Sequence, residues 1–97
     1  MELKLSGEIW YWRGPSPFYF VTVPAEQSGQ IKAIAARVTY GWGVIPVHVT
    51  IGKTSWSTSL FPKDGLYAVP IKNVIREKEK LDAGVKVTLT LTIDESI

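Results

Sequence analysis

Residues 42–71 read WGVIPVHVTIGKTSWSTSLFPKDGLYAVPI, and this stretch decides the fold. Apolar residues occupy every second position of 45–51, which is the period of a β-strand with one buried face. The Gly-Lys pair at 52–53 predicts a tight hairpin turn. Alternation resumes over 54–60, and a short apolar run follows at 66–71. The stretch therefore predicts three consecutive strands.

The three predicted strands are joined and flanked by turn signals. Residues 61–65 read FPKDG, and the final Asp-Gly predicts that this whole segment is a turn. Pro46 interrupts the first of the three strands. Because proline has no backbone N–H, it predicts an edge position or a bulge there.

Further strands are predicted on both sides of this stretch. Residues 3–12 alternate, residues 18–23 are aromatic and β-branched, and a Gly-Pro-Ser-Pro turn separates them. Near the other end of the chain, residues 85–93 show the cleanest alternation of all. These segments add three strands to the three already predicted.

Two short helices are predicted between the strands. Ser28 can cap a helix over 28–37, in which apolar residues recur at helical spacing from Ile31 onward. A second helix is predicted over 73–81, with the mixed charges of 76–80 facing water. The order of elements is then β-β-α-β-β-β-α-β.

This order predicts a mainly β fold. Six strands and two short helices leave too few residues for a parallel α/β fold in a chain of 97 residues. A small antiparallel β-barrel, closed or partly open, buries the one apolar face of each strand. Helices that cover its open ends protect the strand edges. We expect one domain spanning residues 1–97.

Composition removes several classes of function. The chain has no cysteine and one histidine, so neither thiolate chemistry nor a zinc site is expected, and we predict no cofactor. The net charge of +2 is not concentrated in a basic run. No apolar run reaches about 20 residues, the length of a membrane span. The first residues alternate, unlike a signal peptide, so we expect a cytoplasmic protein without membrane association.

Several sequence blocks occur in the order found in a known family. They are Trp42-Gly43-Val44, residues 47–52, 56–62 and 65–72, Arg76, and Gly84 with the strand after it. In these blocks the chain resembles the DUF1905 family, a domain of unknown function, over roughly residues 5–94. The resemblance implies a small closed β-barrel of bacterial or archaeal type, and it implies no activity.

A second likeness covers residues 67–92, which resemble the half-barrel of AbrB-type transcription regulators. In those proteins the glycine before the last strand is typically followed by aspartate, whereas Val85 follows Gly84 here. This departure weakens the implied DNA binding, and barrel topology alone can produce the same order of elements.

The candidate ligand-binding residues gather around the deciding stretch. They are Trp42, His48, Trp56, Ser57, Ser59, Lys72 and Arg76. A pocket beside Trp42, His48 and Trp56 is one hypothesis, although large indoles also fill barrel cores. Lys53, Lys72 and Arg76 are a candidate anion site, with ordinary surface charge as the alternative.

Other residues leave two interpretations open. His48 is a candidate base beside Ser57 or Ser59, but no motif places an orienting acid or an oxyanion hole, so no catalytic residue is assigned. Trp10 and Trp12 share the polar face of their strand and are either a ligand platform or a plug.

The sequence favours a non-enzymatic binding or interaction module of unknown ligand. A nucleic-acid-binding protein with AbrB-like architecture and an enzyme of unknown reaction are the alternatives. The partner is not specified, and self-association stays open.

Overall fold

The computed structural model describes residues 1–14, 18–38 and 44–94. Within these ranges the chain forms eight elements in the order β-β-α-β-β-β-α-β. They are β1 (Glu2–Trp12), β2 (Phe18–Val23), α1 (Ala25–Val38), β3 (Ile45–Ile51), β4 (Thr54–Lys63), β5 (Leu66–Ile71), α2 (Asn73–Glu79) and β6 (Lys86–Thr92).

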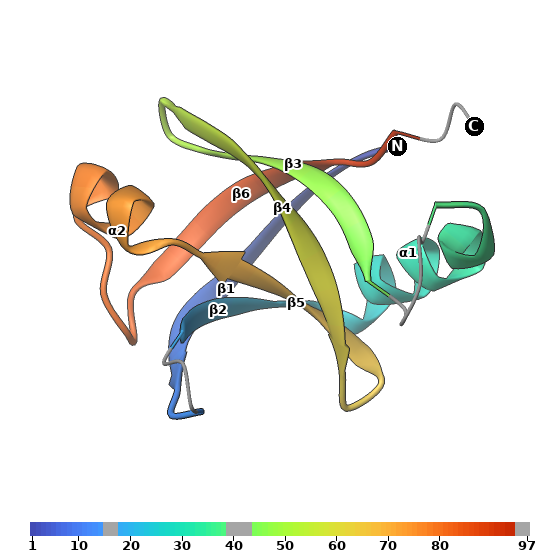
Figure 1. The fold of residues 1–97 in the computed structure, drawn as a ribbon, viewed down its shortest axis with the longest axis horizontal. Coiled ribbons are helices and arrows are strands. Elements are labelled where there is room, and N and C mark those ends of the chain that lie inside the picture. The colour runs from blue at the N-terminus through green and yellow to red at the C-terminus, as the bar shows by residue number, and fades with distance from the viewer. Residues whose placement is uncertain (15–17, 39–43, 95–97) are drawn as a thin grey trace.

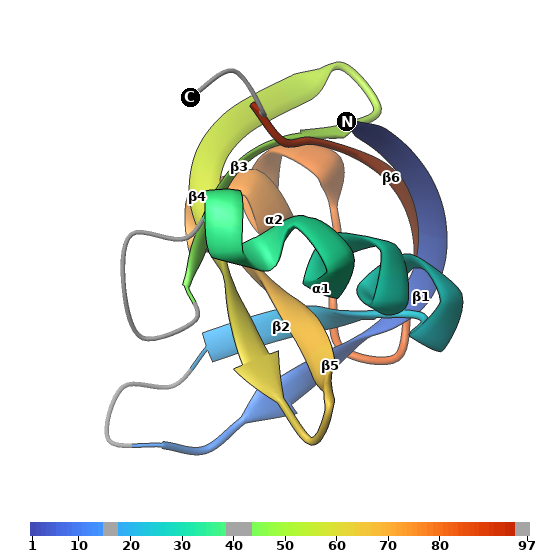
Figure 2. The same cartoon turned by 90° about the vertical axis from the view of Figure 1, so that its right-hand side faces the viewer.

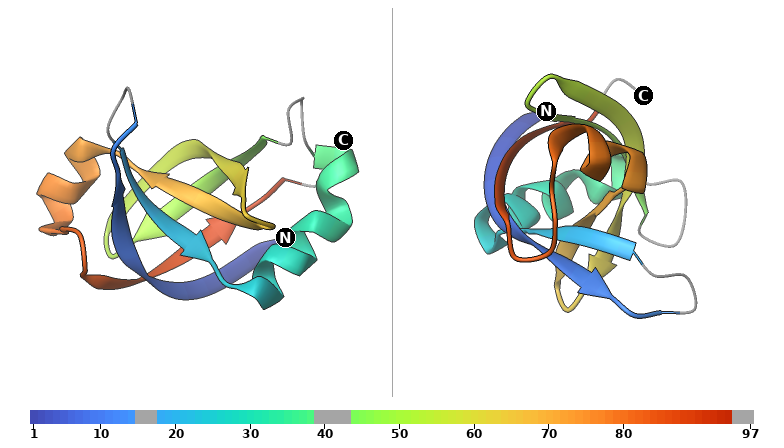
Figure 3. Two further views of the ribbon diagram at one scale, coloured as in Figure 1. Left: turned by 90° about the horizontal axis from the view of Figure 1, so that it is seen from below. Right: turned by 90° about the vertical axis from the view of Figure 1, so that its left-hand side faces the viewer.

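The strands close into an antiparallel barrel in the order β1-β2-β5-β4-β3-β6 (Figure 1). This confirms the mainly β, six-stranded barrel with two short helices. The helices lie at opposite ends of the barrel, as the left view of Figure 3 shows most clearly. Among the described residues, neither helix combines the length and the apolar character needed to cross a membrane.

Two sheets make up the barrel, and β1 and β4 belong to both. The first sheet, which we call the hydroxyl sheet, pairs β1 with β6, β6 with β3, and β3 with β4. The second, the aromatic sheet, pairs β1 with β2, β2 with β5, and β5 with β4. A long strand that bends from one sheet into the other forms a corner of a closed β structure. Their lengths of 11 and 10 residues allow β1 and β4 to do so.

Alternating side chains from all six strands fill the barrel. Leu5, Ile9, Val49, Leu60 and Leu91 are among those with almost no exposed surface. Ile31 and Ile34 of α1 and Ile75 of α2 close the ends, which explains why both helices carry an apolar stripe. The core therefore occupies the barrel lumen, and any surface site must lie outside it.

The segment 61–65 was predicted to be a turn, and this prediction is wrong for its first three residues. β4 continues to Lys63, and Phe61 pairs with Ala68. Only Asp64 and Gly65 form the turn, and both have positive φ angles, 52° and 80°. Two such residues suit the tightest hairpin turns, so the strand needs no longer loop.

Helix α1 begins at Ala25, three residues before the predicted start. Ser28 is therefore not its cap but a buried residue inside the first turn. Its hydroxyl donates to the carbonyl of Val23 at 2.8 Å and accepts from the N–H of Tyr67 at 3.2 Å. Ser28 thus ties the helix to β2 and β5. The other differences are small, since α2 ends at Glu79 and β6 spans Lys86–Thr92.

Three prolines lie within strands, each where the ladder on one side has ended. Pro46 of β3 precedes the residues 48–50 that pair with β6. Pro62 of β4 follows the last residue paired with β3, which is Leu60. Pro70 of β5 follows Ala68, the last residue paired with β4. Proline has no backbone N–H, but no hydrogen bond is lost on a side where no strand is paired. This explains how a closed barrel contains prolines at these three strand positions.

Candidate functional site

The predicted histidine and serines lie on the outer surface of the hydroxyl sheet. His48 and Ser57 are directly opposite one another on β3 and β4, and both are exposed. Nδ1 of His48 lies 3.4 Å from Oγ of Ser57, which is long for a hydrogen bond that activates a nucleophile. Ser59 is on the same face and is half-buried. A serine–base pair is therefore adjacent in space but loosely held.

Trp56 points in the opposite direction from His48. Val49 is its partner across β3 and β4, and both side chains are buried in the lumen. The indole Nε1 of Trp56 has no hydrogen-bond partner among the described residues. His48 and Trp56 therefore do not line a common pocket. Trp42, the third residue of that hypothesis, lies outside the described residues.

The three candidate cations occupy the end of the barrel that α2 covers. Lys53 lies in the turn between β3 and β4, and Lys72 precedes α2; both are exposed. The guanidinium of Arg76 stacks on the ring of Tyr19, with its Cζ 3.5 Å from the ring centroid.

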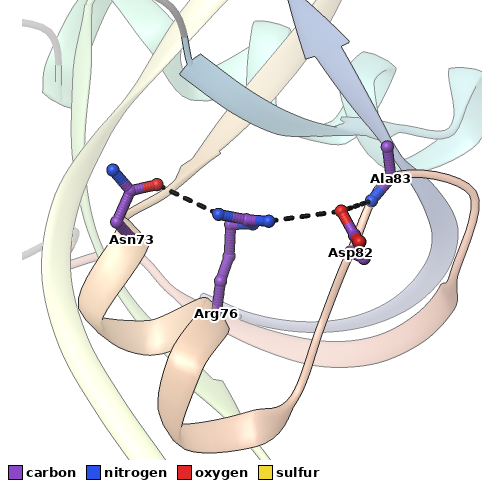
Figure 4. Close-up of polar contacts among 4 residues, drawn as sticks. All are labelled: Asn73, Arg76, Asp82 and Ala83. Atoms are coloured by element: carbon purple, nitrogen blue, oxygen red, sulfur yellow. Dashed lines mark hydrogen bonds and ion pairs between the residues drawn. The ribbon is translucent and has the colours of Figure 1, made fainter.

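Polar partners hold the two terminal nitrogens of Arg76 (Figure 4). One donates to Asn73 at 3.2 Å and the other to Asp82 at 3.2 Å. Asp82 also accepts from the N–H of Ala83. Arg76 thus fixes α2 to β2 and to the following loop, and anion binding by these cations stays a prediction.

Metal-ligand groups are not gathered anywhere in the described part of the chain. No cluster of three or more His, Asp or Glu side chains occurs in those ranges, and the chain contains no cysteine.

A hollow surface lies on the outside of the aromatic sheet. A groove of about 480 Å³ runs over this sheet. Its walls are aromatic rings and prolines with one cation, namely Trp10, Trp12, Phe18, Phe20, Phe61, Pro62, Lys63, Ala68 and Pro70. We call this the aromatic groove. Figure 2 shows the four strand segments that carry it, the paired β1 and β2 beside the paired β5 and β4.

Strand register explains why the rings gather. Trp10 lies opposite Phe20, and Trp12 lies opposite Phe18. The centroids of the Trp10 and Phe20 rings are 5.0 Å apart with their planes inclined by 28°, a stacked arrangement. Trp12 meets the same Phe20 ring edge-on at 6.4 Å. Phe20 is thus the centre of the cluster.

Some rings of the groove are held, and others are open to solvent. Nε1 of Trp10 donates to Oγ1 of Thr22 at 2.9 Å, which fixes the indole plane. By contrast, Trp12 and Phe18 are each 43% exposed and Phe61 is 45% exposed. Exposed rings beside fixed ones form an apolar patch of the kind that marks binding surfaces.

One strand beneath the groove is buried on both faces. Tyr67, Val69 and Ile71 of β5 point into the lumen, while Ala68 and Pro70 point outward and are nevertheless buried. Phe20 lies opposite Pro70 and Phe61 lies opposite Ala68, and these rings cover the outer face of β5. The uninterrupted apolar run at 66–71 is the sequence pattern of a strand that is buried on both faces.

Sequence reasoning considered Trp10 and Trp12 as a platform but missed Phe18, Phe20 and Phe61. Trp12 is exposed and Trp10 is half-buried, so they do not plug the barrel. Phe61 was assigned to a turn, which removed it from the outer face of β4. The alternation within each strand was available from the sequence, and it places Trp10 and Trp12 on one face of β1 and Phe18 and Phe20 on one face of β2. Only the register of the two strands brings these pairs together.

Comparison with known proteins agrees with the resemblance seen in the sequence blocks. No curated protein matches the chain. The family model described as "Domain of unknown function (DUF1905)" matches residues 6–91, which is most of the chain. The matched range includes every residue that lines the aromatic groove. This chain therefore belongs to the DUF1905 family.

Proposed function

We propose that this domain is a non-enzymatic binding module that takes a small, planar aromatic molecule in the aromatic groove. The observation that carries the proposal is the contrast between exposed and fixed rings. Trp12, Phe18 and Phe61 offer open faces, while Trp10 and Phe20 behind them are stacked. A ligand ring entering the groove meets an apolar surface that is already ordered, so little conformational entropy is lost on binding.

The size and chemistry of the groove support the same proposal. A volume of about 480 Å³ lies within the range of small-molecule sites, roughly 300–1,000 Å³. Of the described residues that line it, Lys63 is the only one with a titratable side chain. Ring faces favour stacked or edge-on aromatic partners over flexible aliphatic ones. This composition favours binding of a ligand over catalysis of a reaction on it.

The test uses naphthalene-2-carboxamide, a neutral planar probe, titrated into the protein by isothermal calorimetry. We expect saturable binding by the wild type. Phe61→Ala should weaken it about fivefold, because one ring contact contributes roughly 0.5–1.5 kcal/mol.

Tyr11→Ala is the matched control for this substitution. Tyr11 is as exposed as Trp12 and is its neighbour in the chain, but it does not line the groove. Its substitution should leave the affinity unchanged.

Two results would contradict the proposal. One is equal weakening by Phe61→Ala and Tyr11→Ala, which would show that the probe adheres to any exposed ring. The other is failure of the naphthalene probe to bind. A companion titration tests tight binding of an eight-nucleotide thymidine single strand that added salt abolishes. That result would favour the nucleic-acid alternative, in which bases stack on the same rings.

A further inference from the structure

The aromatic groove does not end at its apolar rings. A second hollow, of about 340 Å³, shares Trp10, Lys63 and Ala68 with it. The additional walls of this hollow include Thr22, Asp64 and Tyr67. The two hollows therefore adjoin one another, with the apolar one reaching Phe18 and Phe61 and the polar one reaching the turn between β4 and β5.

Two hydrogen-bond donors face the polar hollow. The ammonium of Lys63 lies 5.7 Å from the centroid of the Trp10 ring, so it is held over the indole that both hollows share. The hydroxyl of Thr22 accepts from Nε1 of Trp10, which leaves its own hydrogen to donate. An ammonium and a hydroxyl converging on one hollow suit an anionic oxygen.

One carboxylate already interacts with this ammonium, but loosely. Oδ2 of Asp64 is 3.8 Å from Nζ of Lys63, and both side chains are substantially exposed. Exposed ion pairs at this distance contribute little to stability, because water and salt screen them. Asp64 therefore competes with a bound anion without satisfying the ammonium.

We propose that the ligand of the aromatic groove carries a carboxylate, which is placed against Lys63 and Thr22 while the ring lies among the exposed aromatic side chains. The domain is then a receptor for small aromatic carboxylates. This inference rests on the proposed function, and it adds the charge of the ligand and its orientation. The polar hollow fixes the carboxylate, and the apolar hollow selects the ring.

The experiment compares naphthalene-2-carboxylate with the isosteric carboxamide at pH 7 by calorimetry. We expect the wild type to bind the carboxylate about five- to tenfold more tightly, as for a partly exposed charge-assisted contact. Lys63→Gln should abolish the preference, so that the variant binds the carboxylate and the amide with about the same affinity. Raising the salt concentration should weaken carboxylate binding alone.

Two further variants separate this contact from general electrostatics. Lys86→Gln removes the same charge from an exposed position on β6, outside both hollows, and it should have no effect on either probe. Asp64→Asn removes the competing carboxylate and should strengthen carboxylate binding about two- to threefold. Asparagine tolerates the positive φ of this position, so the turn should be retained.

The outcomes distinguish the two proposals. Equal affinity for carboxylate and amide, or equal losses in Lys63→Gln and Lys86→Gln, would overturn the anionic ligand while leaving the aromatic groove as a binding site. Weaker carboxylate binding in Asp64→Asn would also overturn it. Absence of binding for both probes would overturn the proposed function as well.

Discussion

The two sheets of the barrel differ most on their outer faces. Outside the hydroxyl sheet stand serines, threonines, His48 and lysines, joined by short contacts such as Ser6 with Thr88 and Thr50 with Ser55, each at 2.8 Å. Outside the aromatic sheet stand the stacked and exposed rings of the groove. Both sheets bury equally apolar inner faces. The lumen thus requires the same chemistry everywhere, and only the outer surface distinguishes the two sheets.

The shared strands make this contrast sharper. β1 pairs with β6 up to Glu8 and with β2 from Ile9, and its outward residues change from Lys4 and Ser6 to Trp10 and Trp12. β4 changes in the same way after Leu60, from serines to Phe61. The outward chemistry changes where the strand changes its sheet. The outward aromatic residues of β1, β2 and β4 therefore gather outside the aromatic sheet, where register brings them together.

The largest expected effect comes from removing the ring at the centre of the aromatic cluster. Phe20→Ala removes the stacking partner of Trp10 and the outer cover of Pro70. Because Phe20 is half-buried, we expect a loss of about 2 kcal/mol in the free energy of unfolding, below the value for a fully buried phenylalanine. Denaturation by urea measures it.

Thr88→Ala on the hydroxyl sheet is the comparison for this substitution. It removes one exposed hydroxyl contact, that with Ser6. We expect a change within about 0.5 kcal/mol, as for most surface substitutions. Similar losses in the two variants would mean that the aromatic cluster adds nothing to stability beyond an ordinary surface.

The hairpin turns of the two sheets offer a second comparison. Gly52 and Gly65 both have positive φ, 57° and 80°. A Cβ at Gly52 would lie 2.5 Å from the carboxylate of Glu79, whereas one at Gly65 would meet nothing within 4 Å. Glu79 accepts from Thr54 at 2.6 Å and so anchors α2 to β4.

Gly65→Ala should therefore cost about 1 kcal/mol from backbone strain alone. Gly52→Ala should cost about 2 kcal/mol, because the displaced Glu79 also loses its bond to Thr54. Thermal unfolding of both variants measures the difference. Equal losses would show that Glu79 moves away without consequence.

The smallest effect is a dependence of stability on pH that involves the aromatic sheet. Burial raises the pKa of Tyr67 above its usual value, since desolvation disfavours the phenolate. A raised pKa in the folded state contributes stability below the usual pKa of about 10. This contribution is lost as the pH rises through the folded pKa.

Above about pH 10 the wild type should therefore lose stability faster than Tyr67→Phe, which has no phenol to ionise. Urea denaturation from pH 8 to 11 provides the measurement. Parallel curves for the two proteins would show that Tyr67 does not contribute.

Most of the fold could be predicted from the sequence because alternation reports a buried face directly. The bounds of β3 follow from it without change, and those of β2 and β5 follow from a run of aromatic and β-branched residues and from a short apolar run. The end of β4 could not be predicted in this way, since a proline in a strand is tolerated only where a neighbour is missing. Pro62 therefore looks like a turn residue until the extent of β3 is known. Ser28 was wrongly predicted to cap the helix for a similar reason, because its hydrogen-bond partner Tyr67 is distant in sequence.

The candidate site was harder to predict because it depends on which residues are opposite one another. His48 and Trp56 looked like neighbours in a polar pocket. The two-residue turn after Ile51 places Val49, not His48, opposite Trp56, and this determines that the indole is inside. The groove required the register of β1 with β2 and of β5 with β4 together, which no single stretch of sequence contains.

The early end of the β4–β5 ladder also bears on whether one copy of this domain can pair its strand edge with another copy. Because pairing stops at Phe61 and Ala68, Ser55 and Ser57 have a strand neighbour on β3 only within the described part of the chain. An open strand edge invites edge-to-edge aggregation when its surface is apolar. Here the outward side chains on that edge are serines, and the facing strand carries Pro70, which cannot donate. This stretch of the β4 edge is thus a poor template for amyloid-like stacking.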